Sequence, residues 1–232
     1  MTDPIDQQLK TIDAFQGLPA EVLQDIARRC SLREYAPEKT VIAYGERSTT
    51  VFFLVTGSVR ATMFTQHGRE ISYQDLGAGE MFGELAAIDR LPRSTSVITR
   101  ERSSLLLMSG ENFYQLMELY PAIGQATLQK MARVVRFLCD RVYNFGALDV
   151  PSRVRAELCR LAETRGVAID DPQNAIEIEN MPRHQELANS LATHREAVSR
   201  ELGTLEKAGL IRKGRRRLLV LDLDGLRASI DG

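Results

Sequence analysis

The chain contains little of what metal centres, disulfide scaffolds and iron–sulfur clusters require. Its three cysteines, Cys30, Cys139 and Cys159, are far apart and odd in number, which favours free thiols in a reducing compartment. They share no ligand spacing with the three histidines, and an iron–sulfur cluster usually needs more cysteines than these. We therefore expect no structural or catalytic metal and no iron–sulfur cluster.

Long apolar runs and an excess of charge are also missing. No apolar stretch approaches the roughly 18 residues of a membrane span, and the first ten residues, MTDPIDQQLK, lack the apolar core of a secretory signal. The chain has 30 Lys and Arg against 31 Asp and Glu, so any affinity for nucleic acid requires a local basic patch. The sequence predicts a cytoplasmic globular protein with no membrane partner.

The first half of the chain changes from helical to strand-like patterning. Residues 4–40 indicate helical pieces, and Pro19 falls in the first turn of one of them. From Val41 to Met108, short β-branched and aromatic runs alternate with glycines, which predicts an antiparallel sandwich or roll. Gly68 has the context of a hairpin turn.

A long helix is predicted from about Pro121 to Phe145. Its apolar residues are spaced 3, 4, 3, 4 and 3 apart, which is the seam of a parallel two-stranded coiled coil. Packing of this stripe on the helix's own domain is the alternative. The seam residues are Leu128, Met131, Val135, Leu138, Val142 and Phe145.

A domain boundary is expected in the segment ALDVPSR. Pro151 ends or redirects the preceding helix, and Asp149 is a suitable N-cap for the next one. The amphipathic stretch that follows is stopped by Gly166, and the segment IDDPQNAIEIEN after it is polar.

The C-terminal region has helix-turn-helix spacing. One short helix is predicted over residues 185–190, a turn over 191–193, and a second helix over 194–208 that ends at Gly209. The inward positions are small or apolar. They are Leu187, Ala188, Ala197, Val198, Leu202 and Leu205.

The outward face of the second helix carries side chains suited to reading DNA. Arg can bond guanine O6 and N7, and Glu can accept from cytosine N4. The basic segment IRKGRRRLLVLD predicts a β-wing whose tip, with Arg215 and Arg216, binds phosphates. A winged helix used for protein contact is the alternative. The outward residues are His194, Arg195, Glu196, Ser199 and Arg200.

Four segments together resemble the CRP/FNR family of bacterial transcription regulators over nearly the whole length. They are GELAAIDRLPRS, the heptad helix, LDVPSRV and RHQELANSLATHREAVSRELGTLEKAGLI. The resemblance implies an α+β fold with an N-terminal antiparallel β-roll (jelly-roll-like) effector domain over 1–120. It also implies a dimerisation helix over 121–147 and a winged helix-turn-helix over 148–232.

The same resemblance implies partners and DNA contacts. The family acts as a homodimer on palindromic double-stranded DNA and works with RNA polymerase. The positions of Arg195, Glu196 and Arg200 contact bases in a TGTGA-like half-site, and all three residue types are present. His194 replaces a small hydroxyl residue, which leaves the outer half-site bases open.

The segment FGELAAIDRLPRSTS has the chemistry of a clamp for a ribose cyclic phosphate. Arg93 can fork onto a phosphate with help from the Ser94 hydroxyl, and Glu84 can accept from a sugar hydroxyl. Gly83 lets the backbone come close. The family's cyclic-nucleotide branch carries this Gly83-Glu84-Leu85 and Arg93-Ser94 pattern, so cAMP or cGMP is the expected effector. The alternative is that Glu84 and Arg93 pair with each other.

The residues expected at the base discriminate weakly. Relatives that bind cAMP carry a Thr-Ser pair on the long helix, and the matching positions here are Leu138 and Cys139. A leucine makes no hydrogen bond and a thiol is a weak donor. We therefore expect weaker discrimination between cAMP and cGMP than in Thr-Ser members.

Other functions remain open from the sequence. A regulatory subunit that senses cyclic nucleotide shares the loop but does not need the basic wing, and a family member can respond to another effector or to none. An enzyme is disfavoured because no metal cluster or nucleophile–base pair is visible. Haem is not expected, although His67 is a possible lone ligand.

Overall fold

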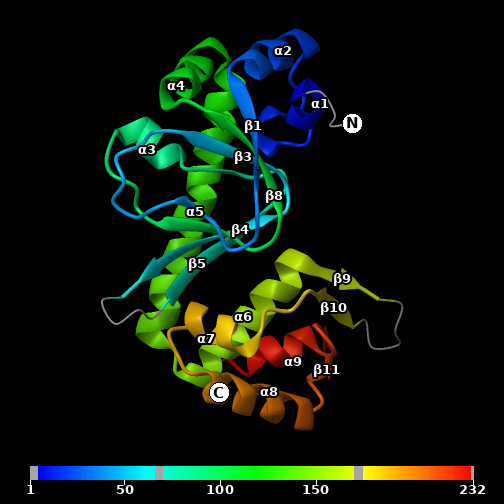
Figure 1. Cartoon of the computed structure of the whole chain (residues 1–232). Helices are drawn as coiled ribbons and strands as arrows, with labels where there is room; N and C mark the ends of the chain where they lie inside the picture. Colours follow the sequence, from blue (N-terminus) through cyan, green and yellow to red (C-terminus); the bar gives the residue numbers. More distant parts are fainter. Residues whose placement is uncertain (1–4, 66–69, 170–174, 231–232) are drawn as a thin grey trace. The chain divides into compact units, whose positions relative to one another are not determined.

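The computed structural model describes residues 5–65, 70–169 and 175–230, and the chain forms two compact units. The first unit spans residues 1–134 and the second spans residues 135–232. The long helix α5 (Pro121–Ala147) contributes its first half to one unit and its second half to the other. Figure 1 shows the elements of each unit.

The first unit is built on two four-stranded antiparallel sheets, with strand orders β1-β8-β3-β6 and β2-β7-β4-β5. The strands are β1 (Cys30–Tyr35), β2 (Thr40–Ile42), β3 (Val51–Thr56), β4 (Ser58–Phe64), β5 (Glu70–Gly77), β6 (Met81–Phe82), β7 (Ser96–Thr99) and β8 (Ser103–Met108). The helices are α1 (Ile5–Leu9), the 3-10 turn η1 (Asp13–Phe15), α2 (Ala20–Arg28), α3 (Glu84–Asp89) and α4 (Gly110–Leu119).

Strand β3 is buried on both faces because successive side chains of a strand point in opposite directions. Phe52 and Leu54 enter the core between the two sheets, where Phe52 stacks on Phe82 with ring centroids 5.1 Å apart. Val51 and Phe53 enter a second core beneath the helices α1, α2, α4 and α5. The sheet is therefore held between two hydrophobic layers.

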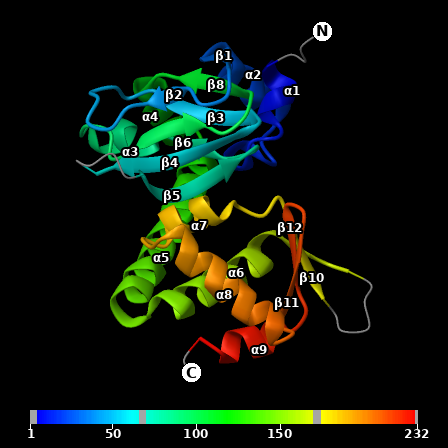
Figure 2. The same cartoon turned by 60° about the horizontal axis from the view of Figure 1, so that its bottom comes forward.

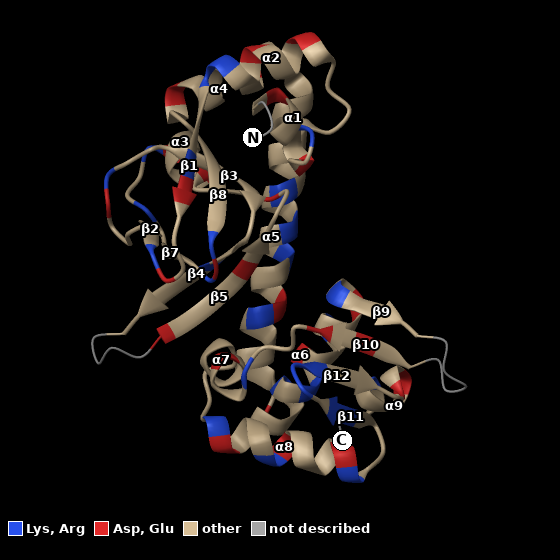
Figure 3. Cartoon of the chain, turned by 45° about the vertical axis from the view of Figure 1, so that its right-hand side comes forward, with Lys and Arg blue, Asp and Glu red and all other residues tan. Residues whose placement is uncertain are grey.

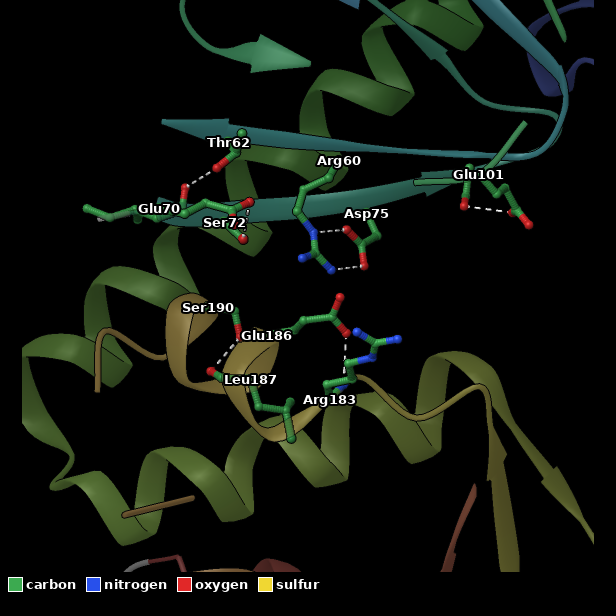
Figure 4. A network of polar contacts seen from close by, with 12 residues as sticks. Arg60, Thr62, Glu70, Ser72, Asp75, Glu101, Arg183, Glu186, Leu187 and Ser190 are labelled. Atoms are coloured by element: carbon green, nitrogen blue, oxygen red, sulfur yellow. Dashed lines mark hydrogen bonds and ion pairs between the residues drawn. The ribbon is translucent and has the colours of Figure 1, made fainter. Parts of the chain in front are cut away.

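A bidentate ion pair joins β4 to β5. Arg60 Nε and Nη2 donate to the two carboxylate oxygens of Asp75 at 2.6 and 2.9 Å, and the residues are direct partners in the strand register (Figure 4). Arg60 is buried, so its charge requires such a partner.

The second unit packs helices around one core and a small antiparallel sheet of order β11-β12-β10-β9. Figure 2 shows α8 next to the β11–β12 hairpin. Beyond α5, the elements are α6 (Val150–Arg165), β9 (Gly166–Ala168), β10 (Ile176–Glu179), α7 (His184–Ser190), α8 (Arg195–Lys207), β11 (Ile211–Gly214), β12 (Arg217–Val220) and α9 (Leu223–Ala228).

The predicted α+β fold is confirmed, with the antiparallel strands, the long helix and the helix-turn-helix in the predicted order. Asp149 caps α6 as expected, because its carboxylate accepts from Ser152 N at 2.9 Å. Pro19 is the N-cap of α2 and so stands just before the first turn. The predictions for His67 and Gly68 lie outside the described residues.

One local expectation was wrong. The helical pattern was extended to residue 40, whereas Cys30–Tyr35 form the edge strand β1.

Gly166 ends α6 as expected, with a negative φ. Glycine is needed there because a Cβ would overlap the carbonyl of Ala162 and the side chain of Ile176.

Candidate functional site

The segment from Gly83 to Ser94 lies between β6 and β7 and includes α3. Gly83 is the N-cap of α3 and adopts a left-handed φ of +82°, which favours glycine. A Cβ at this position would also lie 2.9 Å from Arg93 Nη1 and 3.0 Å from the Thr50 carbonyl. Both the conformation and the close approach of Arg93 therefore require glycine.

Arg93 is 3% exposed and its guanidinium is held by three protein acceptors. Nη1 donates to the Gly83 carbonyl at 2.7 Å, Nη2 to the Thr50 carbonyl at 2.7 Å, and Nε to Ser48 Oγ at 3.0 Å. Burial lowers the pKa of Arg93, against the nearby carboxylates of Glu46 and Glu84. A guanidinium has five N–H donors, so two remain for an anion.

Glu84 is buried and pairs with a lysine of the long helix. Lys130 Nζ lies 2.8 Å from Glu84 Oε2, with side-chain exposures of 14% and 7%, and donates to the Met81 carbonyl at 2.5 Å. At this distance the ammonium and the carboxylate form a close ion pair. The alternative in which Glu84 and Arg93 pair only with each other is therefore not the arrangement found.

The remaining predicted ligand residues lie on the surface of their units. Leu85 is 44% exposed on α3, and Ser94 is exposed after Arg93. Leu138 is 42% exposed on the part of α5 that belongs to the second unit, and Cys139 beside it is an exposed free thiol. The structure brings Gly83, Glu84 and Arg93 together.

Sequence reasoning did not find three groups that complete this site. Ser48 and the Thr50 carbonyl come from the loop between β2 and β3, and Lys130 comes from α5. A backbone carbonyl leaves no mark in a sequence, and Lys130 has the pattern of a solvated helix residue. The only sequence signal for the burial of the Lys130 side chain was that Lys130 directly precedes the seam residue Met131.

Cys30 and Cys159 are not suited to redox chemistry. Burial raises the pKa of Cys30 to about 12 and that of Cys159 to about 11, so neither carries thiolate character near neutral pH. Among the residues that the structure describes, no group of three or more His, Cys, Asp or Glu side chains is placed to hold a metal ion.

Helices α7 and α8 form the predicted helix-turn-helix. Leu187 and Ala188 of α7 pack with Val198, Leu202 and Leu205 of α8 in the core of the second unit. The helix start is set by Glu186, whose carboxylate accepts from Arg183 N at 2.8 Å (Figure 4). This packing fixes the outward face of α8.

That outward face presents most of the predicted DNA-binding residues. His194, the N-cap of α8, and Arg195, Glu196 and Arg200 are exposed, whereas Ser199 is half-buried. Ser199 Oγ and His184 Nδ1 share a hydrogen bond of 2.7 Å. Ser199 is therefore tied to the first residue of α7.

The β11–β12 hairpin forms the basic wing. Figure 3 shows Lys and Arg on α8 and around this hairpin. Lys213 pairs with Glu206 at 2.7 Å and Arg217 pairs with Glu177 at 3.3 Å. Arg215 and Arg216 are exposed at the turn and form no ion pair with the described residues. These two cations are available for phosphate.

A buried ion pair supports α8 from behind. Arg155 Nε of α6 donates to Glu201 Oε1 of α8 at 2.7 Å, and Arg155 Nη1 donates to the Ser229 carbonyl after α9. Arg141 of α5 stacks on Phe137 and Phe145 and donates to the Ser190 carbonyl at the end of α7.

The described parts of the chain include no helix long and apolar enough to cross a membrane.

The two units match two family models. A model for cyclic nucleotide-binding domains matches residues 32–120, and one for Crp-like helix-turn-helix domains matches residues 152–229. A cyclic nucleotide-binding domain joined to a Crp-like helix-turn-helix domain defines the class of DNA-binding transcription regulators.

Curated relatives agree with this class. The chain is 28% identical to the cAMP-activated global transcriptional regulator CRP of Haemophilus influenzae, over 86% of this chain and 88% of that protein. It is 25% identical to the CRP-like cAMP-activated global transcriptional regulator of Mycobacterium tuberculosis, over 96% and 98%. The two family models and these relatives together identify the chain as a transcription regulator of the CRP/FNR family.

Solved structures show the same fold. A CooA mutant from Carboxydothermus hydrogenoformans matches with a TM-score of 0.81 at 21% identity, covering 96% of this chain and 99% of that one. The regulator CLP of Xanthomonas campestris, described as c-di-GMP responsive, matches with a TM-score of 0.72 at 23% identity, covering 87% and 99%.

Proposed function

We propose that this chain is a homodimeric transcription factor gated by a ribose cyclic phosphate, cAMP or cGMP, that acts in the cytoplasm on palindromic DNA and with RNA polymerase. The observation that carries the effector assignment is the buried pair of opposite charges at one loop. Arg93 retains two N–H donors for a phosphate, and Glu84 lies beside Gly83, whose carbonyl accepts from Arg93. The names of the curated relatives specify cAMP.

Discrimination between the two nucleotides is proposed to be weak. The resemblance assigns base recognition to the positions of Leu138 and Cys139, and neither side chain is a strong hydrogen-bonding group. A site without polar partners for a base edge rejects the wrong base poorly. Calorimetry with cAMP and cGMP tests this directly, and affinities that differ by about a hundredfold or more would contradict it.

Dimerisation through α5 is supported by the exposure of the predicted seam. In the single chain, three seam residues are largely exposed: Leu128 is 71%, Val135 59% and Val142 72% exposed. A row of exposed aliphatic side chains is unusual on the surface of a monomer and indicates an interaction surface. A second copy of α5 would remove this row from water. Light scattering checks it, and Val135→Glu should weaken the dimer by placing a charge in the seam.

DNA binding is proposed to divide between base and phosphate contacts. Arg195, Glu196 and Arg200 would read base edges, while His194 and Ser199 border them and Arg215 and Arg216 bind the backbone. The test is a mobility shift on a palindromic fragment with TGTGA-like half-sites, with and without cyclic nucleotide. Arg195→Ala should abolish specific binding and leave the salt-dependent non-specific binding in place.

Gating requires that the effector bind two dimer arrangements with different affinities, since equal affinity shifts no equilibrium. The mobility shift therefore has to respond to nucleotide. A protein that binds the palindrome equally well with and without cAMP or cGMP would retain the DNA-binding assignment and lose the effector assignment.

A further inference from the structure

Lys130 forms an ion pair with Glu84, the carboxylate of the proposed effector site. Its ammonium bridges Glu84 Oε2 at 2.8 Å and the Met81 carbonyl at 2.5 Å. One side chain of α5 thus contacts both the start of β6 and the start of α3, the elements on either side of Gly83.

The position of Lys130 is fixed by packing of its helix. Ile123 is fully buried in the core of the first unit, and Thr127 is buried one turn later with its hydroxyl donating to the Ile123 carbonyl at 2.8 Å. Lys130 follows Thr127 by three residues, so it emerges from the same face of α5. A rigid backbone therefore sets where the ammonium lies.

Burial makes the charge of Lys130 necessary. A carboxylate that is removed from water needs a partner, and removing one member of a buried pair leaves an uncompensated charge. The ion pair with Lys130 is made by Oε2 of Glu84, which leaves the other carboxylate oxygen, Oε1, as the one to accept from a ligand hydroxyl.

Charge balance leads to the same residue. Arg93 and Lys130 are two buried or nearly buried cations, and Glu84 is the buried anion between them. Among these buried groups, the charges of Glu84 and Arg93 cancel without Lys130, and one positive charge is left over with it. The carboxylate of Glu46 is also near Arg93, but Glu46 is exposed, so solvent screens its charge. The net charge of the buried groups therefore matches the single negative charge of a cyclic phosphodiester.

We infer that Lys130 is a positioning residue of the effector site, which orients Glu84 toward the sugar hydroxyl and offsets its charge so that a cyclic phosphate is bound. The inference rests on the proposed function. A ribose 3′,5′-cyclic phosphate has one free sugar hydroxyl, at the 2′ position. Lys130 therefore acts on recognition of that hydroxyl without touching it.

The experiment is a cycle between a protein substitution and a ligand substitution. Calorimetry measures the affinity of full-length wild type and Lys130→Met for cAMP and for 2′-deoxy-cAMP. Wild type should bind the deoxy ligand about tenfold to a hundredfold more weakly, because a hydrogen bond to a charged acceptor is lost. Lys130→Met should bind cAMP more weakly and discriminate against the deoxy ligand by less than about threefold.

A matched control separates positioning from general charge effects. Arg133→Met removes a cation from the same helix at an exposed position and should keep the wild-type discrimination. A merely structural Lys130 would weaken both ligands by the same factor and leave their ratio unchanged, which would overturn the inference. Lys130→Arg restores a cation and should recover part of the ratio.

Two further outcomes are distinct. If wild type binds no cyclic nucleotide, the proposed effector and this inference both fail; if wild type binds and Lys130→Met keeps the full ratio, only the inference fails. Should Lys130→Met not fold, Lys130→Ala removes both the charge and the donor with a smaller side chain, and an unchanged ratio in that variant likewise overturns the inference.

Discussion

Substitution of Gly83 by alanine tests the effector loop most directly. Its φ of +82° is a conformation that costs an alanine about 1–2 kcal/mol. The added Cβ would also lie 2.9 Å from Arg93 Nη1 and 3.0 Å from the Thr50 carbonyl, so the guanidinium has to move from at least one acceptor. Gly83→Ala should therefore lose stability and effector affinity together.

Gly17 provides the control for backbone strain. Its φ is +76° and nothing lies within 4 Å of the Cβ that an alanine would add. Gly17→Ala should lose the same 1–2 kcal/mol, or about 4 °C in Tm for each kcal/mol in a unit of this size. It should bind cAMP with wild-type affinity, because Arg93 is not disturbed.

Displacing one charge-assisted hydrogen bond of Arg93 costs about 1.5–3 kcal/mol, so Gly83→Ala should bind cAMP about tenfold to a hundredfold more weakly. Calorimetry and thermal melting on both variants give the two quantities separately. Equal cAMP affinity in Gly83→Ala and Gly17→Ala would refute the reasoning that the backbone at Gly83 exists to accommodate Arg93.

Three further predictions concern the second unit. Burial, and then the charges of Arg195 and Lys213, lower the pKa of His184 below its ordinary 6.5. The unfolded chain therefore binds more protons, and the free energy of unfolding falls as the pH drops below about 6.5. Denaturation at pH values from 7.5 to 5 should show a smaller decrease in this free energy for His184→Gln than for wild type. Gly166→Ala should destabilise the unit by steric overlap, whereas a Cβ at Gly203 meets nothing within 4 Å and Gly203→Ala should stabilise α8 by up to about 1 kcal/mol in thermal melts. Arg215→Ala should weaken DNA binding uniformly across sequences and reduce the slope of log affinity against log salt by about one, and a change in sequence preference would contradict a phosphate role.

The strands of the roll could be predicted because their residues carry the evidence locally. The segment VFFLVTGSVRATMF has β-branched and aromatic runs on both sides of Gly57, whose φ of +89° makes the turn. Strand β1 could not be predicted in the same way. It lies at a sheet edge, and only Leu32 and Tyr35 give Cys30–Tyr35 any larger apolar side chains.

The same distinction applies to the sites. The helix-turn-helix was predictable from periodicity and from Gly209, whose φ is +75°. The effector loop was predictable as a pair of charges, but the partners of Glu84 and Arg93 depend on tertiary packing. Lys130 is distant in sequence from Glu84, and Arg93 binds backbone carbonyls that any residue would supply.

The two-sided burial of β3 has a consequence for spectroscopy. Phe52 stacks on Phe82, the residue directly before Gly83. The Arg93 guanidinium lies 6.0 Å from the centroid of the Phe52 ring. Phe53 instead contacts Phe15 and Phe113, with centroids 4.8 and 6.2 Å away. Fluorine labels on these adjacent phenylalanines are therefore a probe and an internal reference. The resonance of Phe52 should report on Arg93, while that of Phe53 reports on the integrity of the helical layer.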